Sequence, residues 1–232
     1  MFTRRNKQRG VSAKEEGYFE LKKELPDFYK TVAEETLCRC DPKEGVWVDL
    51  GSGAGGVGLS LAERTTSMIV MIDPNQDALQ KALEEAKKAE LGKRIIAIKA
   101  MAEDIPLPDN CIDLVVSRGS IFFWNDKAQG LREVFRILSP GGKAMIGGGL
   151  GATYPQWARQ EFTRRRHEGM KKEGPEAYKR FQDARSPETF RQLANDAGLA
   201  DFEIAGDGEP NSESSQAGLG IWLLFRKGNG KI

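Results

Sequence analysis

A short stretch near residue 50 has the residue types and spacing of a ligand-binding turn. Apolar and β-forming residues over 46–50 indicate a buried strand, with the carboxylate of Asp49 near its end. The strand leads into a glycine-rich turn, and closely spaced glycines let bare backbone approach a ligand. The turn residues that could touch such a ligand are Gly51, Ser52, Gly53 and Gly55.

The glycine-rich turn by itself admits three interpretations. Gly51, Gly53 and Gly56 match the Gly-x-Gly-x-x-Gly pattern of dinucleotide loops, which alone is a weak signal. Asp49 argues against a dinucleotide, because a fixed negative charge would repel a pyrophosphate. A ligand with a cationic end suits the carboxylate better, and a purely structural glycine turn is the third interpretation.

A second carboxylate, Asp73, follows Gly51 by 22 positions and comes directly after the apolar run 68–72. At the end of a second strand it could accept hydrogen bonds from ribose hydroxyls. The plainer alternative is a structural Asp-Pro turn with Pro74. The spacing from the glycine turn favours the ribose contact.

The glycine turn and the two carboxylates resemble motifs I and II of the class I S-adenosylmethionine-dependent methyltransferases. Residues 100–117 are similar to the family's run between strands three and four, and residues 132–142 are similar to its helix ending in Pro-Gly-Gly. One position departs from the pattern, because Met101 stands where many relatives place an aspartate for the adenine amino group. The resemblance covers about residues 46–148 and points to the small-molecule branch, which includes quinone-biosynthesis methyltransferases.

This resemblance implies S-adenosyl-L-methionine as cofactor and S-adenosyl-L-homocysteine as product. It also implies a Rossmann-like α/β fold, a doubly wound, mostly parallel seven-stranded sheet with helices on both faces and a final antiparallel strand. Asp49 would orient the methionine end, Asp73 would hold the ribose, and Ala102 would offer its backbone N–H to the adenine. Met101 would pack against the adenine face, and the contact with the adenine amino group would be lost, supplied by backbone or taken over by Glu103. The expected cofactor-binding residues are Asp49, Gly51, Ser52, Gly53, Gly55, Asp73, Pro74, Met101, Ala102, Glu103 and Ser117.

Aromatic and basic residues after the fourth and fifth expected strands could bind a methyl acceptor. Residues 117–124 carry more apolar surface than a solvent-facing loop should, although about half of it could be core. Residues 154–191 hold ten Lys or Arg against six Asp or Glu, which could bind an anionic group or form solvated helix faces. The only histidine, His167, is a candidate general base or a solvated residue, and no catalytic residue is assigned. The expected acceptor-binding residues are Arg118, Phe122, Trp124, Tyr154, Trp157, Arg164 and His167.

The expected activity is methylation of a small metabolite that could carry an anionic group. Two other functions stay open, methylation of RNA or protein and cofactor binding without catalysis. No acceptor motif of the Asn-Pro-Pro-Tyr type follows the fourth strand, and the formal net charge of +1 gives no general attraction to nucleic acid. Cys38 and Cys40 could hold a soft ion, but no neighbouring His or Cys completes a shell, so no metal is expected. The sequence does not fix the oligomeric state.

The elements that must position these residues alternate between strand and helix, which predicts parallel pairing with right-handed crossovers. The expected strands are 46–50, 68–72, 94–99, 112–116, 143–146, 202–205 and 219–225. The expected helices are one that starts after Pro26 and ends at about Cys40, one over 56–64, one capped by Asn75 or Asp77 that ends at Leu91, one over 126–138, two within 151–186 broken at Gly174-Pro175, and one over 187–197. A turn at 139–142 is expected before the fifth strand.

The length of 232 residues favours one domain. Its expected parts are an N-terminal arm and helix (1–45), a cofactor-binding core (46–150), a lid-like helical insertion (151–186) and a C-terminal helix with strands (187–232). Residues 1–17 are polar and are expected to be loosely ordered. No apolar run is long enough to cross a bilayer, and three cysteines are too few for a disulfide framework, so a cytoplasmic protein is expected.

Overall fold

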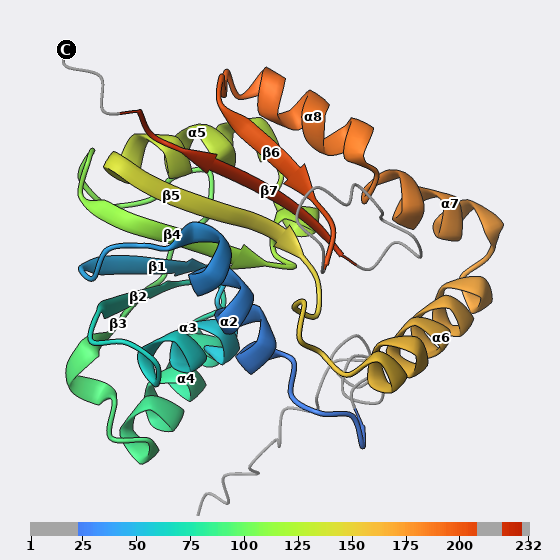
Figure 1. The fold of residues 1–232 in the computed structure, drawn as a ribbon, viewed down its shortest axis with the longest axis horizontal. Helices are drawn as coiled ribbons and strands as arrows, with labels where there is room; N and C mark the ends of the chain where they lie inside the picture. Colours follow the sequence, from blue (N-terminus) through green and yellow to red (C-terminus); the bar gives the residue numbers. More distant parts are fainter. Residues whose placement is uncertain (1–22, 208–219, 229–232) are drawn as a thin grey trace, which may run out of the picture.

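The computed structural model describes residues 23–207 and 220–228, and its centre is a seven-stranded sheet in the order β3-β2-β1-β4-β5-β7-β6 (Figure 1). The expected loose arm over 1–17 lies outside the described residues. The strands are β1 Val46–Leu50, β2 Met68–Ile72, β3 Ile95–Ile98, β4 Ile112–Arg118, β5 Leu138–Gly148, β6 Phe202–Ala205 and β7 Ile221–Arg226. Strands β1 to β5 pair in parallel, and β7 runs antiparallel to both of its neighbours. The predicted fold class is confirmed.

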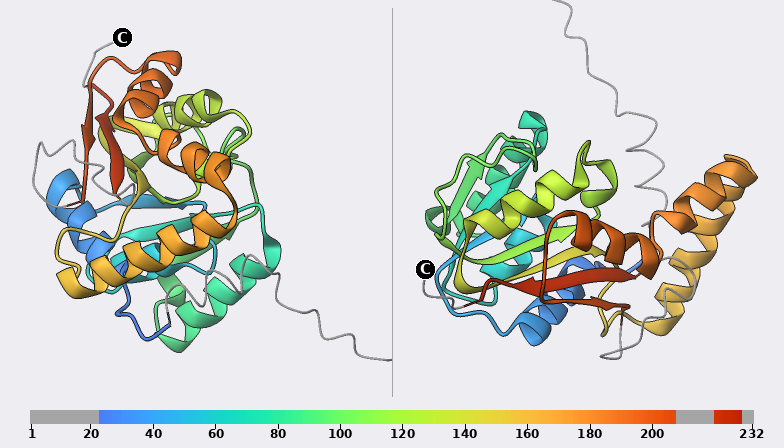
Figure 2. Two further views of the ribbon diagram at one scale, coloured as in Figure 1. Left: turned by 90° about the vertical axis from the view of Figure 1, so that its right-hand side faces the viewer. Right: turned by 90° about the horizontal axis from the view of Figure 1, so that it is seen from above.

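Helices cover both faces of the sheet, because strands buried on two sides need apolar partners on each (Figure 2). The helices are α2 Tyr29–Cys40, α3 Gly56–Ala62, α4 Gln76–Lys88, α5 Lys127–Ile137, α6 Gln156–Lys172, α7 Pro175–Asp183 and α8 Pro187–Asp196, with short 3-10 turns at Gly92–Arg94 and Ile121–Phe123. One core packs α5 and α8 against the sheet, and the other packs α2, α3 and α4 against the opposite face.

Three helices begin at a residue whose side chain caps them. Asn75 accepts from the backbone N–H groups of Asp77 and Ala78 at the start of α4. Asp126 and Ser186 cap α5 and α8 in the same way. These side-chain oxygens satisfy N–H groups that have no partner within the helix, which fixes where each helix begins.

The turn expected at 139–142 is wrong, because β5 already begins at Leu138 and runs through this segment. Ile112 pairs with Leu138 and Leu114 with Lys143, so an irregularity in the register absorbs the extra residues. Backbone hydrogen bonds from Gly141 to Lys227 and from Lys227 to Gly142 tie the same segment to the chain after β7. Long-range backbone pairing therefore overrides the local turn preference of the Pro-Gly-Gly sequence.

Helices α6 and α7 project from the sheet edge where β4 and β5 end (Figure 1). The first half of α6 is anchored by Ala158 and Phe162, which pack with Phe28, Leu150 and Tyr154. The insertion predicted over 151–186, with its break at Gly174-Pro175, is therefore present as two helices beside the carboxyl ends of the strands. This is the edge at which doubly wound sheets bind their ligands.

Candidate functional site

The glycine-rich turn after β1 adopts a backbone that side chains would obstruct. Gly51, Gly53 and Gly55 have φ values of 70°, 52° and 83°, a left-handed region that glycine enters at little cost. The N–H groups of Gly51 and Ser52 donate to the carbonyl of Ile72, which ties the turn to the end of β2. A Cβ on Gly53 would meet nothing within 4 Å, so the backbone there lies open to a ligand.

Asp49 lies beneath this turn and is 2% exposed. Its Oδ2 accepts from the backbone N–H of Gly58 at 2.7 Å. A Cβ on Gly58 would lie 3.0 Å from that oxygen, so glycine at this position lets α3 sit close to the carboxylate. Burial, and to a lesser degree the nearby charge of Asp73, raises the pKa of Asp49 to about 7. A ligand cation beside Asp49 would favour its ionised form.

Asp73 follows β2 and holds two backbone segments at once. Its Oδ2 accepts from the N–H of Gly53 at 2.8 Å, and its Oδ1 accepts from the N–H of Asn75 at 2.8 Å. Pro74, beside it, is exposed. A hollow of about 530 Å³ opens here, and its lining residues are Gly53, Ala54, Asp73, Asn75, Asp77, Ala78 and Lys81. The structure therefore brings the glycine turn and the second carboxylate together at one cavity.

The segment after β3 approaches the same edge of the sheet. Met101 is 41% exposed, whereas Ala102 is buried. Oε1 of Glu103 accepts from the backbone N–H groups of Asn125 at 2.6 Å and Asp126 at 3.1 Å. Oε2 of Glu103 is buried and accepts no hydrogen bond from the described residues, and the same holds for the hydroxyl of Ser52. Buried polar atoms without a hydrogen-bond partner in the described part of the protein are expected where a ligand supplies that partner.

A serine pair joins β4 to the glycine turn. The hydroxyls of Ser117 and Ser120 lie 2.5 Å apart, and Ser120 also donates to the carbonyl of Leu50 at 3.0 Å. The indole N–H of Trp124 donates to the Ser120 hydroxyl at 3.1 Å, and its ring packs over Gly130. Ser120 was missed by the sequence reasoning, because no motif marks a residue that connects two loops through its side chain.

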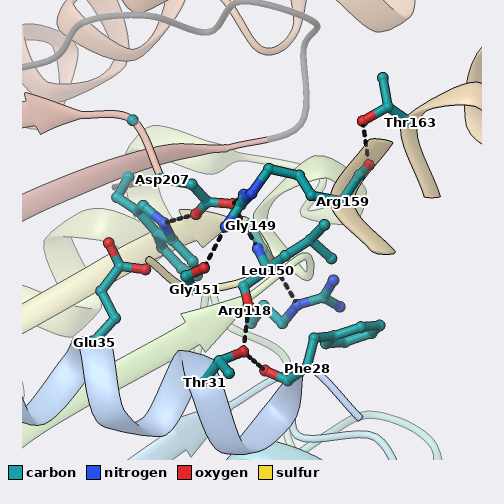
Figure 3. Close-up of polar contacts among 12 residues, drawn as sticks. Phe28, Thr31, Glu35, Arg118, Gly149, Leu150, Gly151, Arg159, Thr163 and Asp207 are labelled. Atoms are coloured by element: carbon teal, nitrogen blue, oxygen red, sulfur yellow. Dashed lines mark hydrogen bonds and ion pairs between the residues drawn. The ribbon is translucent and has the colours of Figure 1, made fainter. Parts of the chain in front are cut away.

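A polar cluster fastens the loop 149–151, which leads from β5 into α6 (Figure 3). Oδ2 of Asp207 accepts from the N–H of Leu150 and from Arg159, both at 2.7 Å. Arg118 donates from Nε to the carbonyl of Gly149 at 2.8 Å, and Thr31 donates to the carbonyl of Leu150. These contacts hold the base of the α6 helix against the end of the sheet.

Glu35 of α2 lies buried beside this cluster and forms an ion pair with Arg39, with Nε and Oε1 2.7 Å apart (Figure 3 shows Glu35). Burial raises the pKa of Glu35 to about 7, and the charge of Asp207 acts in the same direction. The carboxyl group therefore titrates near neutral pH although it is paired with a guanidinium.

The expected acceptor residues divide into two groups in space. Arg118 and Phe122 lie at the ends of β4 and β5, where Phe122 would contact a Cβ on Gly148 at 3.0 Å. Tyr154 is buried nearby, with its hydroxyl donating to the carbonyl of Pro26. These residues border the cofactor edge of the sheet.

Of the other expected residues, Trp124 donates to Ser120 as described above, and Trp157, Arg164 and His167 lie on helix α6. The Arg164 guanidinium pairs with Glu161 and Glu168 of its own helix, and Trp157 is 58% exposed. His167 packs edge-on against Tyr178 of α7, with ring centroids 5.5 Å apart. Arg164 and His167 thus contact side chains of α6 and α7, and Trp157 is exposed to solvent.

Comparison with known proteins decides the family. The methyltransferase domain family matches residues 48–146, which includes the glycine turn and both carboxylates. Over these residues the chain belongs to the class I S-adenosylmethionine-dependent methyltransferases. A solved structure from Methanococcus maripaludis, described as an S-adenosyl-L-methionine-dependent methyltransferase, matches it with a TM-score of 0.74 and 29% identity, covering 94% of this chain and 93% of the other.

Sequence relatives of this methyltransferase match it only in part. The 2-methyl-6-phytyl-1,4-hydroquinone methyltransferase of Arabidopsis thaliana is 35% identical over 115 residues, which are 50% of this chain and 32% of the relative. A ubiquinone/menaquinone biosynthesis C-methyltransferase of Geotalea daltonii is 32% identical over 101 residues, 43% of each chain. This methyltransferase therefore spans about a third of the length of the plant relative.

The residues of this methyltransferase fit the cofactor of its family. The open backbone at Gly53 and the buried oxygens of Ser52 and Glu103, which have no described partner, are groups that a polar ligand would satisfy. Within residues 23–207 and 220–228, no cluster of three or more His, Cys, Asp or Glu could hold a metal ion, and Cys38 is exposed while Cys40 is buried. No helix in the same ranges is long and apolar enough to cross a membrane.

Proposed function

We propose that this protein transfers a methyl group from S-adenosyl-L-methionine to a small-molecule acceptor and releases S-adenosyl-L-homocysteine. The observation that carries the proposal is the meeting of the open glycine turn and Asp73 at one cavity, with Asp49 buried beneath the same turn, in a chain that matches this family. A carboxylate beneath the turn suits the cationic methionine end and disfavours the pyrophosphate of a dinucleotide.

The proposed cofactor contacts follow from the positions of these side chains. Asp49 stabilises the ammonium end through the turn, and Asp73 accepts from the ribose hydroxyls. Glu103 offers its buried Oε2 to the adenine amino group. This contact replaces the one that the family's aspartate makes, since Met101 stands at that position here. Ala102 offers its backbone N–H to the adenine ring, Met101 packs on the ring face, and Ser52 supports the methionine moiety. Gly51, Gly55, Pro74 and Ser117 complete the proposed cofactor site.

The sulfonium supplies an already activated methyl group, so the protein has to position the acceptor and exclude water. The loop 117–124 borders the end of β4 and would help to position the acceptor. His167 packs edge-on against Tyr178 of α7, and we assign it no role as a general base. We therefore propose catalysis by positioning, with proton removal required of the protein only if the acceptor begins protonated.

The substrates named for the relatives do not identify the acceptor of this protein. The plant and bacterial relatives are named for hydroquinone and quinone substrates, but they match this chain in 43% to 50% of its length. Residues 48–146, which the methyltransferase domain family matches, contain the cofactor side of the sheet. We place acceptor specificity in the loop after β4 and in helices α6 and α7, and the two helices lie outside the matched residues.

Isothermal titration calorimetry tests the cofactor half of the proposal. We expect saturable binding of S-adenosyl-L-methionine and S-adenosyl-L-homocysteine and none of NAD. Binding of NAD without either S-adenosyl compound would overturn it. Incubation with a metabolite extract and S-adenosyl-L-methionine tests the catalytic half, with S-adenosyl-L-homocysteine formation as the readout. Cofactor binding without turnover in any extract would favour a non-catalytic binding protein, and turnover restricted to RNA or protein fractions would replace the small-molecule acceptor.

A further inference from the structure

Residues 119–126 connect β4 to α5, and we call them the β4–α5 loop (Figure 1). The loop carries Phe122 and Trp124, two of the residues expected to bind the methyl acceptor. Its middle forms the 3-10 turn Ile121–Phe123. The guanidinium carbon of Arg185, in the segment between α7 and α8, lies 3.7 Å from the ring centroid of Phe122. The loop therefore lies between the sheet edge and the segment that leaves the lid.

Ser120 fastens the start of the β4–α5 loop to the glycine turn. Its hydroxyl donates to the carbonyl of Leu50 at 3.0 Å. Since a hydroxyl has one proton, it accepts in its other two contacts, from the hydroxyl of Ser117 and from the indole N–H of Trp124. A Cβ on Gly51 would collide with the Ser120 side chain, so the turn and the loop are in direct contact. A shift of the glycine turn is therefore passed to the loop.

Glu103 fastens the end of the same loop. Its Oε1 accepts from the backbone N–H groups of Asn125 at 2.6 Å and Asp126 at 3.1 Å. Asp126 also caps α5, so this carboxylate fixes the point at which the helix begins. Oε2 of Glu103 is buried and has no hydrogen-bond partner among the described residues. One oxygen of the carboxylate is thus committed to the loop, and the other is available to a ligand.

We propose that Ser120 and Glu103 are positioning residues that place the β4–α5 loop in response to the bound cofactor. The adenine amino group, donating to Oε2, would hold the Glu103 carboxylate and through it the end of the loop. The glycine turn, closed on the methionine end, would hold the start of the loop through Ser120. A ligand shifts a conformation only through contacts that differ between two states, and the donor gained by Oε2 is such a contact.

This inference rests on the proposed function and adds an order of binding to it. Because the β4–α5 loop bears Phe122 and Trp124, the surface expected to meet the acceptor is fixed when the cofactor is in place. The cofactor therefore binds first and the acceptor second. A loop placed in advance also lowers the entropy that the acceptor loses on reaching the methyl group.

Hydrogen exchange of the full chain, followed by mass spectrometry, tests the inference, and calorimetry of the same samples measures cofactor binding. The reporting amides are those of residues 123–126, which bond within the 3-10 turn or to Glu103. Saturating S-adenosyl-L-homocysteine is expected to slow their exchange at least about tenfold, since a hydrogen bond to a charged group supplies that ratio. Equal exchange with and without the bound compound would overturn the inference.

A matched ligand isolates the contribution of the adenine amino group. The 6-deamino analogue of S-adenosyl-L-homocysteine, with purine in place of adenine, lacks this one donor. At saturation it should slow the amides of residues 123–126 much less than S-adenosyl-L-homocysteine does. Equal slowing by both compounds would show that Oε2 of Glu103 does not sense the adenine, and the inference would fail.

Glu103→Gln separates the two oxygens of this side chain. The amide oxygen can still accept from the N–H groups of Asn125 and Asp126, whereas an NH₂ group in place of Oε2 cannot accept from the adenine. We expect S-adenosyl-L-homocysteine to bind about tenfold more weakly to this variant. At saturation the amides of residues 123–126 should gain much less protection than in the wild-type protein. Protection equal to that of the wild-type protein would contradict the role of Glu103.

Ser120→Ala removes the contact with the glycine turn. The slowing of the loop amides at saturation should fall by roughly two- to tenfold, and Ser120→Thr, which keeps the hydroxyl, should restore it. Ser139→Ala is the matched control, because the Ser139 hydroxyl also bonds a backbone carbonyl, that of Ile112 at 3.1 Å. Both of these residues lie at the starts of parallel strands, at the opposite edge of the sheet. Equal slowing in Ser120→Ala and Ser139→Ala would make Ser120 a merely structural residue and overturn the inference.

The calorimetry separates this result from the outcome of the proposed function. A wild-type protein that binds S-adenosyl-L-homocysteine without slowing the loop amides refutes only the positioning of the loop. A wild-type protein that does not bind the compound refutes the proposed function, and this inference with it. Since Glu103→Gln and Ser120→Ala change opposite ends of the loop, misfolding of one variant leaves the other to decide the matter.

Discussion

Substitution of Asp73 by alanine tests how the glycine turn and the ribose share one carboxylate. A carboxylate offers about four lone-pair sites. Gly53 and Asn75 each use one in the structure, through bonds of 2.8 Å. The remaining sites face the hollow and can accept from the two ribose hydroxyls. Asp73→Ala is expected to weaken S-adenosyl-L-homocysteine binding by roughly 1 to 3 kcal/mol, about 5- to 150-fold.

The same substitution also has a structural cost that must be measured separately. Losing two backbone hydrogen bonds of about 1 kcal/mol each should lower the thermal midpoint by about 4 to 8 °C in a chain of this size. Asp73→Asn would not avoid this cost, because both carboxylate oxygens accept from N–H groups and an amide would turn one acceptor into a donor. Affinity alone therefore cannot separate the two roles of Asp73.

A double-mutant cycle between protein and ligand separates them. Calorimetry compares S-adenosyl-L-homocysteine with its 2′-deoxy analogue on the wild-type protein and on Asp73→Ala. If Asp73 binds the ribose, the wild-type protein loses affinity for the deoxy analogue and the variant loses much less. Equal losses in both proteins would refute the ribose contact and leave Asp73 as a support of the turn. Glu85→Ala, on the same helix α4 but outside the lining of the hollow, is the control and should bind both ligands as the wild-type protein does.

Two further predictions concern stability. Gly55→Ala should lower the free energy of unfolding in urea by about 1 to 2 kcal/mol, because φ is 83° and a Cβ would lie 3.0 to 3.1 Å from Ala82 and Met71. The control Gly169→Ala, in helix α6 with open space around it, should instead gain about 0.5 to 1 kcal/mol, and a loss equal to that of Gly55→Ala would contradict the conformational argument. For Glu35, burial raises the pKa from 4.5 to about 7, so the folded state binds more protons than the unfolded state between these values, and stability falls as the pH rises through this window. Glu35→Gln should reduce this decrease in the free energy of unfolding by up to about 3 kcal/mol, measured by urea unfolding at pH 5 and pH 8. An unchanged pH profile in the variant would show that Glu35 is ionised throughout.

The cofactor side of the site was predictable because its determinants are local. Strand, glycine turn and helix follow one another within about twenty residues, and each is specified by its own residue types. Parallel strands bring their carboxyl ends to one edge, so Asp49 and Asp73 had to lie near each other once the order of elements was known. The family resemblance rested on the same stretch of sequence.

The positions of the expected acceptor residues depend on how distant segments pack, so the sequence alone does not give them. Arg164 and Arg166 look equivalent in the sequence, but two positions along a helix turn a side chain by about 200°. Arg164 consequently pairs with acids of its own helix, whereas Arg166 faces Phe181 of α7. Arg185 could not have been singled out, because its partner Phe122 lies more than sixty residues earlier in the chain.

The sequence by itself determined the fold class, the glycine turn and the pair of carboxylates at the ends of β1 and β2. Periodicity, helix caps and glycine positions act over a few residues, so they can be read without knowing the fold. Only the tertiary structure decided that β5 continues through 139–142, that Ser120 links two loops, and that Arg185 stacks on Phe122. These features arise from side-chain and backbone contacts between segments far apart in the chain, and the packing of the lid against the sheet determines them.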